Sequence, residues 1–157
     1  MQGGALEQLL HLPMPAWITI ALNDLNDARV AELIEAFRTE ELAAGQTDPM
    51  PRIIATVAAE LRDCIAFGGR TLSATADSIP AGLKDLAVGK IVRALKTRLL
   101  QAFTDDERTA EALYQKRLEN LRDGNWPVDA PEDPIDQPPI AKQTGYYGSD
   151  DPVNICG

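Results

Sequence analysis

Hydrophobic positions in the middle of the chain recur at helical spacing, and the clearest run predicts a helix over 51–67. Asp48 and the prolines at 49 and 51 predict its start, and the glycines at 68 and 69 predict its end. Seven apolar residues of this run fall within an arc of about 140° on a helical wheel. They are Ile53, Ile54, Val57, Ala58, Leu61, Cys64 and Ile65.

A second amphipathic pattern predicts a longer helix over 80–103, with Pro80 in its first turn. Its apolar arc holds Ala87, Val88, Ile91, Val92, Leu95, Leu99 and Phe103. We expect this helix to be the main partner of the 51–67 helix. Its polar side is basic, with Lys84, Lys90, Arg93, Lys96 and Arg98 against the single acid Asp85.

Arg98 projects into the apolar arc of this helix, and two arrangements satisfy it. Its stem can pack on the core while the guanidinium reaches water. Alternatively, the guanidinium forms an ion pair with Glu60, Asp63 or a neighbouring subunit, since a buried charge needs a partner.

Two further helices flank this pair. Thr104 and Glu107 form a capping-box sequence that predicts a new helix, which ends near Asp123 and Gly124. Earlier in the chain, Asn23 or Asp27 is suited to cap a helix that reaches about residue 44. Its apolar stripe is narrow and most of its remaining surface is acidic, which predicts a helix on the outside of the core. The stripe consists of Val30, Leu33, Ile34 and Phe37.

The remaining segments predict less regular structure. Residues 1–22 form an N-terminal arm in which the apolar run 17–22 is too short to assign to strand or helix. The long loop 68–78 favours a contact with a partner or another subunit. Residues 127–157 are proline-rich and acidic, which predicts an extended tail without helix, either a disordered solvating tail or an arm that becomes ordered on a partner. The fold class is therefore all-α, a bundle of about four helices over 23–126 between a flexible arm and an extended tail.

Composition narrows the function classes. The formal net charge is −9 with a pI near 4.5, which argues against a general nucleic-acid binder. The two cysteines, Cys64 and Cys156, form no disulfide framework, and with His11 as the only histidine a zinc site is not expected. No signal peptide or membrane span is expected, and no convergent set of nucleophile and base indicates an enzyme. We expect no cofactor.

The order of the helical motifs resembles that of the head-to-tail adaptor proteins of tailed phages and prophages, also called head-completion or connector proteins. The resemblance covers about residues 48–128. It rests on the sequences Met50–Ile54, Val57–Arg62, Ile65–Ala66, Gly68–Gly69, Ile79–Ala87, Ile91–Arg93, Arg98–Leu100, Tyr114–Gln115 and Leu118–Gly124.

The resemblance implies a structural virion protein, made in the host cytoplasm and located in the neck at the head–tail junction. Such proteins form a ring, usually of twelve subunits, under the portal protein. The ring extends the DNA channel and receives a stopper or tail-completion protein. An acidic channel wall would let DNA pass without sequence-specific binding.

Two sets of interface candidates follow from this expectation. Basic residues are candidates for contacts between subunits: Arg70, Lys90, Arg93, Lys96 and Arg98. Apolar residues of the tail are candidates for docking on a partner, with the tyrosines as the expected anchors. These are Trp126, Ile135, Ile140, Tyr146, Tyr147, Val153 and Ile155. The alternative function is a monomeric phage-encoded regulatory or binding module with an acidic tail.

Overall fold

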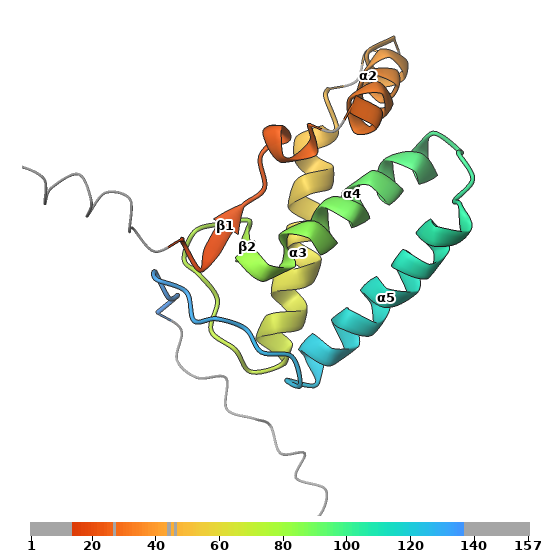
Figure 1. The fold of residues 1–157 in the computed structure, drawn as a ribbon. Helices are drawn as coiled ribbons and strands as arrows, with labels where there is room; N and C mark the ends of the chain where they lie inside the picture. The colour runs from red at the N-terminus through yellow and green to blue at the C-terminus, as the bar shows by residue number, and fades with distance from the viewer. Residues whose placement is uncertain (1–13, 27, 44, 46, 137–157) are drawn as a thin grey trace, which may run out of the picture.

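Four α-helices and a small two-stranded sheet make up the part of the chain that the structure describes (Figure 1). The structure is a computed structural model, and it describes residues 14–26, 28–43, 45 and 47–136. The helices are α2 (Ala28–Ala43), α3 (Met50–Phe67), α4 (Lys84–Arg98) and α5 (Asp105–Arg122), and the strands are β1 (Trp17–Thr19) and β2 (Ser78–Pro80). The 3₁₀ turns η1 (Leu22–Leu25) and η2 (Ala81–Leu83) complete them.

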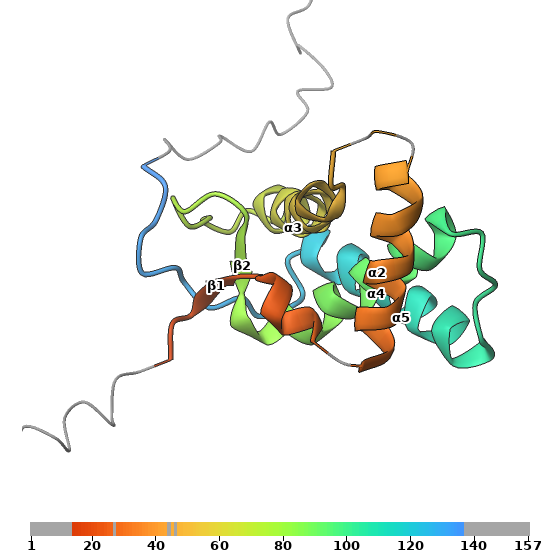
Figure 2. The ribbon, with the colours of Figure 1, turned by 90° about the horizontal axis from the view of Figure 1, so that it is seen from above.

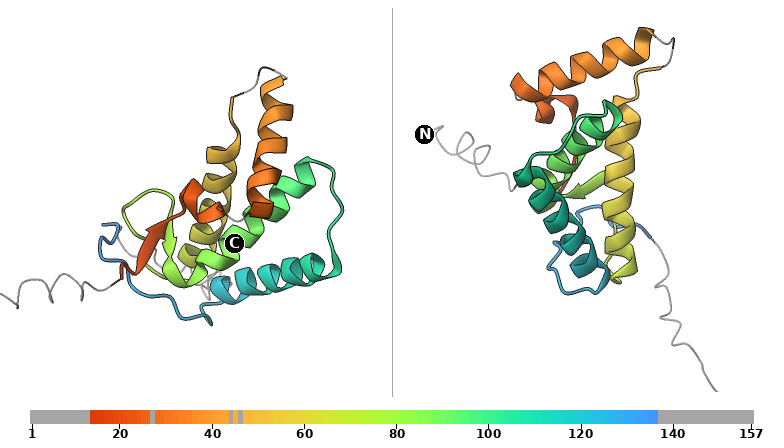
Figure 3. Two further views of the ribbon diagram at one scale, coloured as in Figure 1. Left: turned by 45° about the horizontal axis from the view of Figure 1, so that its top comes forward. Right: turned by 90° about the vertical axis from the view of Figure 1, so that its right-hand side faces the viewer.

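Helix α3 lies at the centre of the core, as its apolar arc predicts. All seven residues of that arc are buried. The Asp48 carboxylate accepts the Met50 N–H at 3.0 Å at the start of the helix, and Gly68 follows its end. The helix packs against both α4 and α5, and more extensively against α5 (Figure 3). The expectation that α4 is its main partner is therefore wrong.

Helix α4 is shorter at both ends than the predicted 80–103. Pro80 lies in an extended conformation, with φ −54° and ψ 134°, and β2 pairs antiparallel with β1 so that Ile18 faces Ile79. Strand pairing therefore replaces the first predicted turn. At the other end, Leu100 has a φ of +53°, which no residue inside a right-handed helix adopts.

The apolar run 17–22, which the sequence assigned to neither strand nor helix, begins with strand β1. This strand also changes the predicted boundary between the N-terminal arm and the folded body. Trp17 and Ile20 are buried in the same core as α3, and the Ala81 N–H donates to the Ala16 carbonyl at 2.8 Å. The predicted arm 1–22 is thus too long at its C-terminal end. The part of the arm before Met14 lies outside the described residues.

Helix α5 begins and ends where the sequence predicts. The Thr104 hydroxyl accepts the Glu107 N–H, and the Glu107 carboxylate accepts the Thr104 N–H at 2.8 Å, so the capping box is confirmed. Gly124 follows the helix with φ +71°. Here the chain passes so close to the end of α3 that a Cβ on Gly68 would lie 2.2 Å from the Leu121 carbonyl oxygen.

Helix α2 lies across one end of the body and contacts α4 (Figure 2). Leu33, Ile34 and Phe37 of its predicted stripe are buried, and Val30 is half-buried. Glu32, Glu35 and Glu40 on the other side are exposed. The prediction of an outer helix with an acidic solvent face is therefore confirmed.

The chain after α5 does not leave the body at residue 127. In Figure 1 the blue segment runs from the end of α5 back towards β1. We call residues 129–135 the strap, because they lie along the loop 68–78 and form an isolated β-bridge between Ser73 and Pro134. The folded body thus extends past the predicted boundary at 126, and residues 137–157 of the predicted tail lie outside the described residues.

Candidate functional site

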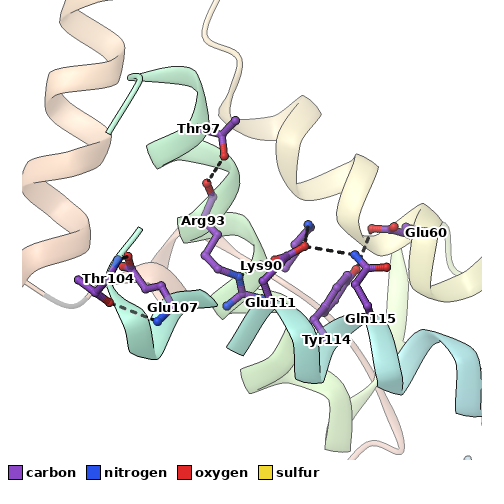
Figure 4. Close-up of polar contacts among 9 residues, drawn as sticks. All are labelled: Glu60, Lys90, Arg93, Thr97, Thr104, Glu107, Glu111, Tyr114 and Gln115. Carbon is purple, nitrogen blue, oxygen red and sulfur yellow. Dashed lines mark hydrogen bonds and ion pairs between the residues drawn. The ribbon is translucent and has the colours of Figure 1, made fainter. Parts of the chain in front are cut away.

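The facing sides of α4 and α5 are joined by ion pairs (Figure 4). One Glu111 oxygen lies 2.5 Å from the Lys90 Nζ, and the other lies 2.7 Å from the Arg93 Nε. One turn further along, Lys96 pairs with Glu107. Arg93 is buried with 6% of its surface exposed, so Glu111 supplies the partner that a buried guanidinium requires. We call these five residues the clamp.

The clamp holds its acids in the charged form. Burial alone would raise the pKa of Glu111, but the hydrogen bonds from Lys90 and Arg93 outweigh burial and lower that pKa to about 2. The hydrogen bond from Lys96 likewise lowers the pKa of Glu107. The acids of the clamp are therefore ionised at neutral pH and bound to cations of the same chain.

Tyr114 extends this polar layer towards α3. Its side chain is fully buried, and its hydroxyl donates to the Glu60 carboxylate at 2.8 Å. Burial, with the neighbouring Glu60 charge, raises the pKa of the Tyr114 phenol far above its ordinary value. The phenol thus stays protonated and links α5 to α3. The whole layer joins helices and leaves no activated nucleophile among its members.

The basic residues proposed as interface candidates are mostly engaged within the chain. Lys90, Arg93 and Lys96 belong to the clamp, and Arg70 is exposed and donates to the Gly124 carbonyl at 3.3 Å. Arg98 is exposed and forms no ion pair with the described residues. It therefore does not lie in the core, and neither Glu60 nor Asp63 is its partner.

A second polar cluster fastens the strap to the loop 68–78. The Asp133 carboxylate accepts the Ser73 hydroxyl at 2.6 Å and the Thr75 hydroxyl at 2.5 Å. Backbone bonds run alongside, from the Ala74 N–H to the Asp133 carbonyl and from the Ile135 N–H to the Leu72 carbonyl. These hydroxyls lower the pKa of the Asp133 carboxyl. The loop expected to meet a partner is thus bound, at least in part, by its own chain.

Arg62 supports the same loop from the side of α3. Its guanidinium donates to the Ser73 carbonyl at 2.8 Å and the Ser78 carbonyl at 2.7 Å, and it stacks on Trp17 with 5.8 Å to the ring centroid. The Trp17 indole N–H donates in turn to the Asp129 carbonyl at 2.8 Å. Arg62 and Trp17 therefore join α3, β1, the loop and the strap.

Two of the tail candidates, Trp126 and Ile135, lie in the described segment that follows α5. Trp126 is half-buried against the core, and the Arg117 guanidinium stacks on its ring, with 3.1 Å to the centroid. Ile135 is half-buried beside Leu72 at the end of the strap. Both residues contact the folded body of the same chain. The other candidates lie outside the described residues: Ile140, Tyr146, Tyr147, Val153 and Ile155.

A groove of about 710 Å³ opens between α2, α4 and the turn that joins α4 to α5. Val30, Leu33, Ala36 and Val92 contribute its apolar part. Glu32 and Asp106 contribute acidic side chains to its lining. We call this the α2–α4 groove. Lys96 and Glu107 of the clamp line it as well.

Leu100, in the turn beside this groove, was not among the candidates. Its side chain is 93% exposed, and its φ of +53° lies in the left-handed region that a leucine rarely adopts. The pattern of apolar positions does not predict this turn, because it places residue 100 inside the helix 80–103. The acids of the clamp were missed for a different reason, since nothing in α5 alone indicates which cations they face.

Comparison with models of known protein families, with curated proteins and with solved structures finds no match for this chain. Among the described residues, no three metal-ligating side chains gather in one place. In the same part of the chain, no helix has both the length and the apolar composition needed to cross a bilayer.

Proposed function

We propose that this protein is a head-to-tail adaptor of a tailed phage or prophage, a structural protein that joins others as a ring under the portal. The observation that supports the proposal most is where the resembling residues lie. Residues 48–128 carry the resemblance, and they build α3, β2, α4 and α5 around one core. The motifs thus belong to one packed body rather than to scattered segments.

The charge distribution supports the same proposal. The chain has a net charge of −9, its basic helix is largely neutralised by α5, and the exposed side of α2 is acidic. Such a surface repels the phosphate backbone, so DNA would slide past it without binding. In the proposed role the partners are further copies of this chain, the portal protein and a stopper or tail-completion protein.

The test is co-assembly with the portal. Purified full-length protein is mixed with portal particles of the phage or prophage that encodes it, and the products are separated by size and imaged. The proposal predicts that the chain joins the portal particle as a ring, and that it is present at the neck of purified virions. Absence of the chain from virions, together with no binding to portal particles, would contradict the proposal.

A second candidate is a monomeric regulatory or binding module encoded by a phage. The clamp favours this candidate, because Lys90, Arg93 and Lys96 have their counter-charges within the subunit and need no neighbour. Native mass separates the two proposals. A monomer at every concentration that is indifferent to portal particles supports the binding module, and a ring or a portal-bound subunit supports the adaptor.

A further inference from the structure

Leu100 occupies a position at which the fold itself favours glycine. The Leu100 N–H donates to the Thr97 carbonyl at 3.2 Å, and the Gln101 N–H donates to the Lys96 carbonyl at 2.9 Å. These two bonds form a Schellman motif at the end of α4, whose left-handed residue is usually glycine. A leucine there strains the backbone, and its exposed side chain gives the subunit no packing in return.

The exposed leucine lies beside an unpaired cation. Arg98, two residues earlier, is exposed and has no ion pair among the described residues. The end of α4 and the turn therefore present a positive charge and an apolar side chain to solvent within two residues of each other. A surface that receives it should combine an apolar floor with acidic groups.

The α2–α4 groove has this composition. Val30, Leu33 and Ala36 give it apolar lining, and Glu32 and Asp106 give it negative charge, while Lys96 in the same lining is paired with Glu107. Gln101 lines the groove, whereas Leu100 does not, so the leucine lies outside the groove of its own subunit. The two complementary surfaces of one chain are thus neighbours that do not contact each other within the subunit.

We propose that Leu100 and Arg98 of one copy of this chain dock into the α2–α4 groove of a second copy. The leucine would pack on Val30 and Ala36, and the guanidinium would pair with Glu32 or Asp106. When each copy passes its turn to a different neighbour, the contact repeats head-to-tail, and such contacts close into rings when the rotation allows it. This inference deepens the proposed adaptor function, because it names the contact between neighbouring subunits of the ring.

Cysteine cross-linking between two differently tagged full-length chains tests the contact, with Cys156→Ser in both. One chain carries Leu100→Cys and the other carries Ala36→Cys, an exposed position in the groove. The matched control replaces the second chain with Ala112→Cys, which is exposed on α5 outside the groove. Under mild oxidation at high protein concentration, we expect a mixed dimer with Ala36→Cys in clear excess over the control. Equal yields in the two mixtures would overturn the proposal.

Substitutions that leave the turn intact give a second test. Leu100→Gly suits the backbone and removes the side chain, so it should weaken self-association about five- to thirtyfold, as truncation of one contributing interface side chain does. Leu113→Ala removes another exposed leucine, on α5, and should leave association unchanged. Equal association of wild type and Leu100→Gly would overturn the proposal. If the contact fails but the chain still joins portal particles, the adaptor function stands and only this interface is wrong.

Discussion

The facing sides of α4 and α5 and the turn that joins them differ in where their side chains find partners. Along the facing sides, Glu111 binds Lys90 and Arg93 within the same chain, and Arg93 is buried. In the turn, Leu100 is almost fully exposed and the backbone is strained around it. The charged residues therefore stabilise the subunit, whereas the apolar residue in the turn contributes little to it.

This difference reverses an expectation drawn from charge. A basic helix in an acidic protein suggests an intermolecular surface, yet three of its cations are paired with two acids of the adjacent helix. The proposed contact rests instead on strain without benefit to the fold, because strained positions concentrate where a structure serves a function. Four experiments test this difference between the clamp and the turn.

The largest effect is expected beneath the clamp, in the core between α3, α4 and α5. Leu61, Ile91, Leu95 and Leu118 are all buried there. Leu95→Ala should lower the free energy of unfolding by about 2–5 kcal/mol, measured by urea denaturation. Leu113→Ala, at an exposed position on α5, is the control and should change it little. An unchanged thermal midpoint for Leu95→Ala would show that the helices are paired wrongly.

Glu111→Gln should give the next largest effect. The change removes the charge that compensates buried Arg93, so it should destabilise the subunit by roughly 2–4 kcal/mol, somewhat below the cost for a fully buried pair. Glu119→Gln, exposed on the same helix, is the matched control. If both variants unfold at the same denaturant concentration, the clamp contributes nothing to the stability of the subunit.

The clamp also predicts how stability depends on pH. The pKa of Glu111 is about 2 in the folded protein against an ordinary 4.5, so its contribution is complete above pH 4.5 and is lost as the pH falls towards 2. The shift corresponds to about 3 kcal/mol. Unfolding free energies measured from pH 6 to pH 2 should fall less steeply for Glu111→Gln than for wild type. Identical slopes would contradict the assignment.

The smallest effect is expected in the turn, and it has the opposite sign. Leu100→Gly relieves the left-handed strain at the cost of a more flexible unfolded chain, so it should stabilise the subunit by roughly 0.5–1 kcal/mol. Leu100→Ala keeps a side chain at the strained φ, so it should not stabilise the protein. A destabilised Leu100→Gly would mean that the leucine side chain supports the fold.

Local sequence signals account for much of the fold. Helix α3 has a start signal, a wide apolar arc and a glycine stop, and α5 has a capping box, so both helices are found where the sequence predicts them. The error at α4 arose because Pro80 suits an extended strand as well as a first helical turn. The decisive factor was pairing with Trp17–Thr19, which lies far away in the sequence.

The polar contacts depended on the three-dimensional arrangement. Glu111 and Glu107 are two of several acids on α5, and only the register of the two helices selects them as partners for α4. Similarly, Asp133 is one of several acids in a proline-rich stretch, and it becomes special only when the strap reaches Ser73 and Thr75. Sequence periodicity carries no information about such pairings between segments.

The central claim is that the clamp stabilises the fold whereas the turn contacts a second copy of the chain. Sedimentation velocity tests it most directly, together with thermal midpoints, on full-length wild type, Leu100→Gly and Glu111→Gln. We predict that wild type gains mass with concentration. Leu100→Gly should no longer gain mass with concentration, while its thermal midpoint rises. Glu111→Gln should have a lower thermal midpoint, but at temperatures below that midpoint it should still gain mass with concentration. A Leu100→Gly protein that associates like wild type, or a Glu111→Gln protein that remains folded but loses association, would contradict this division.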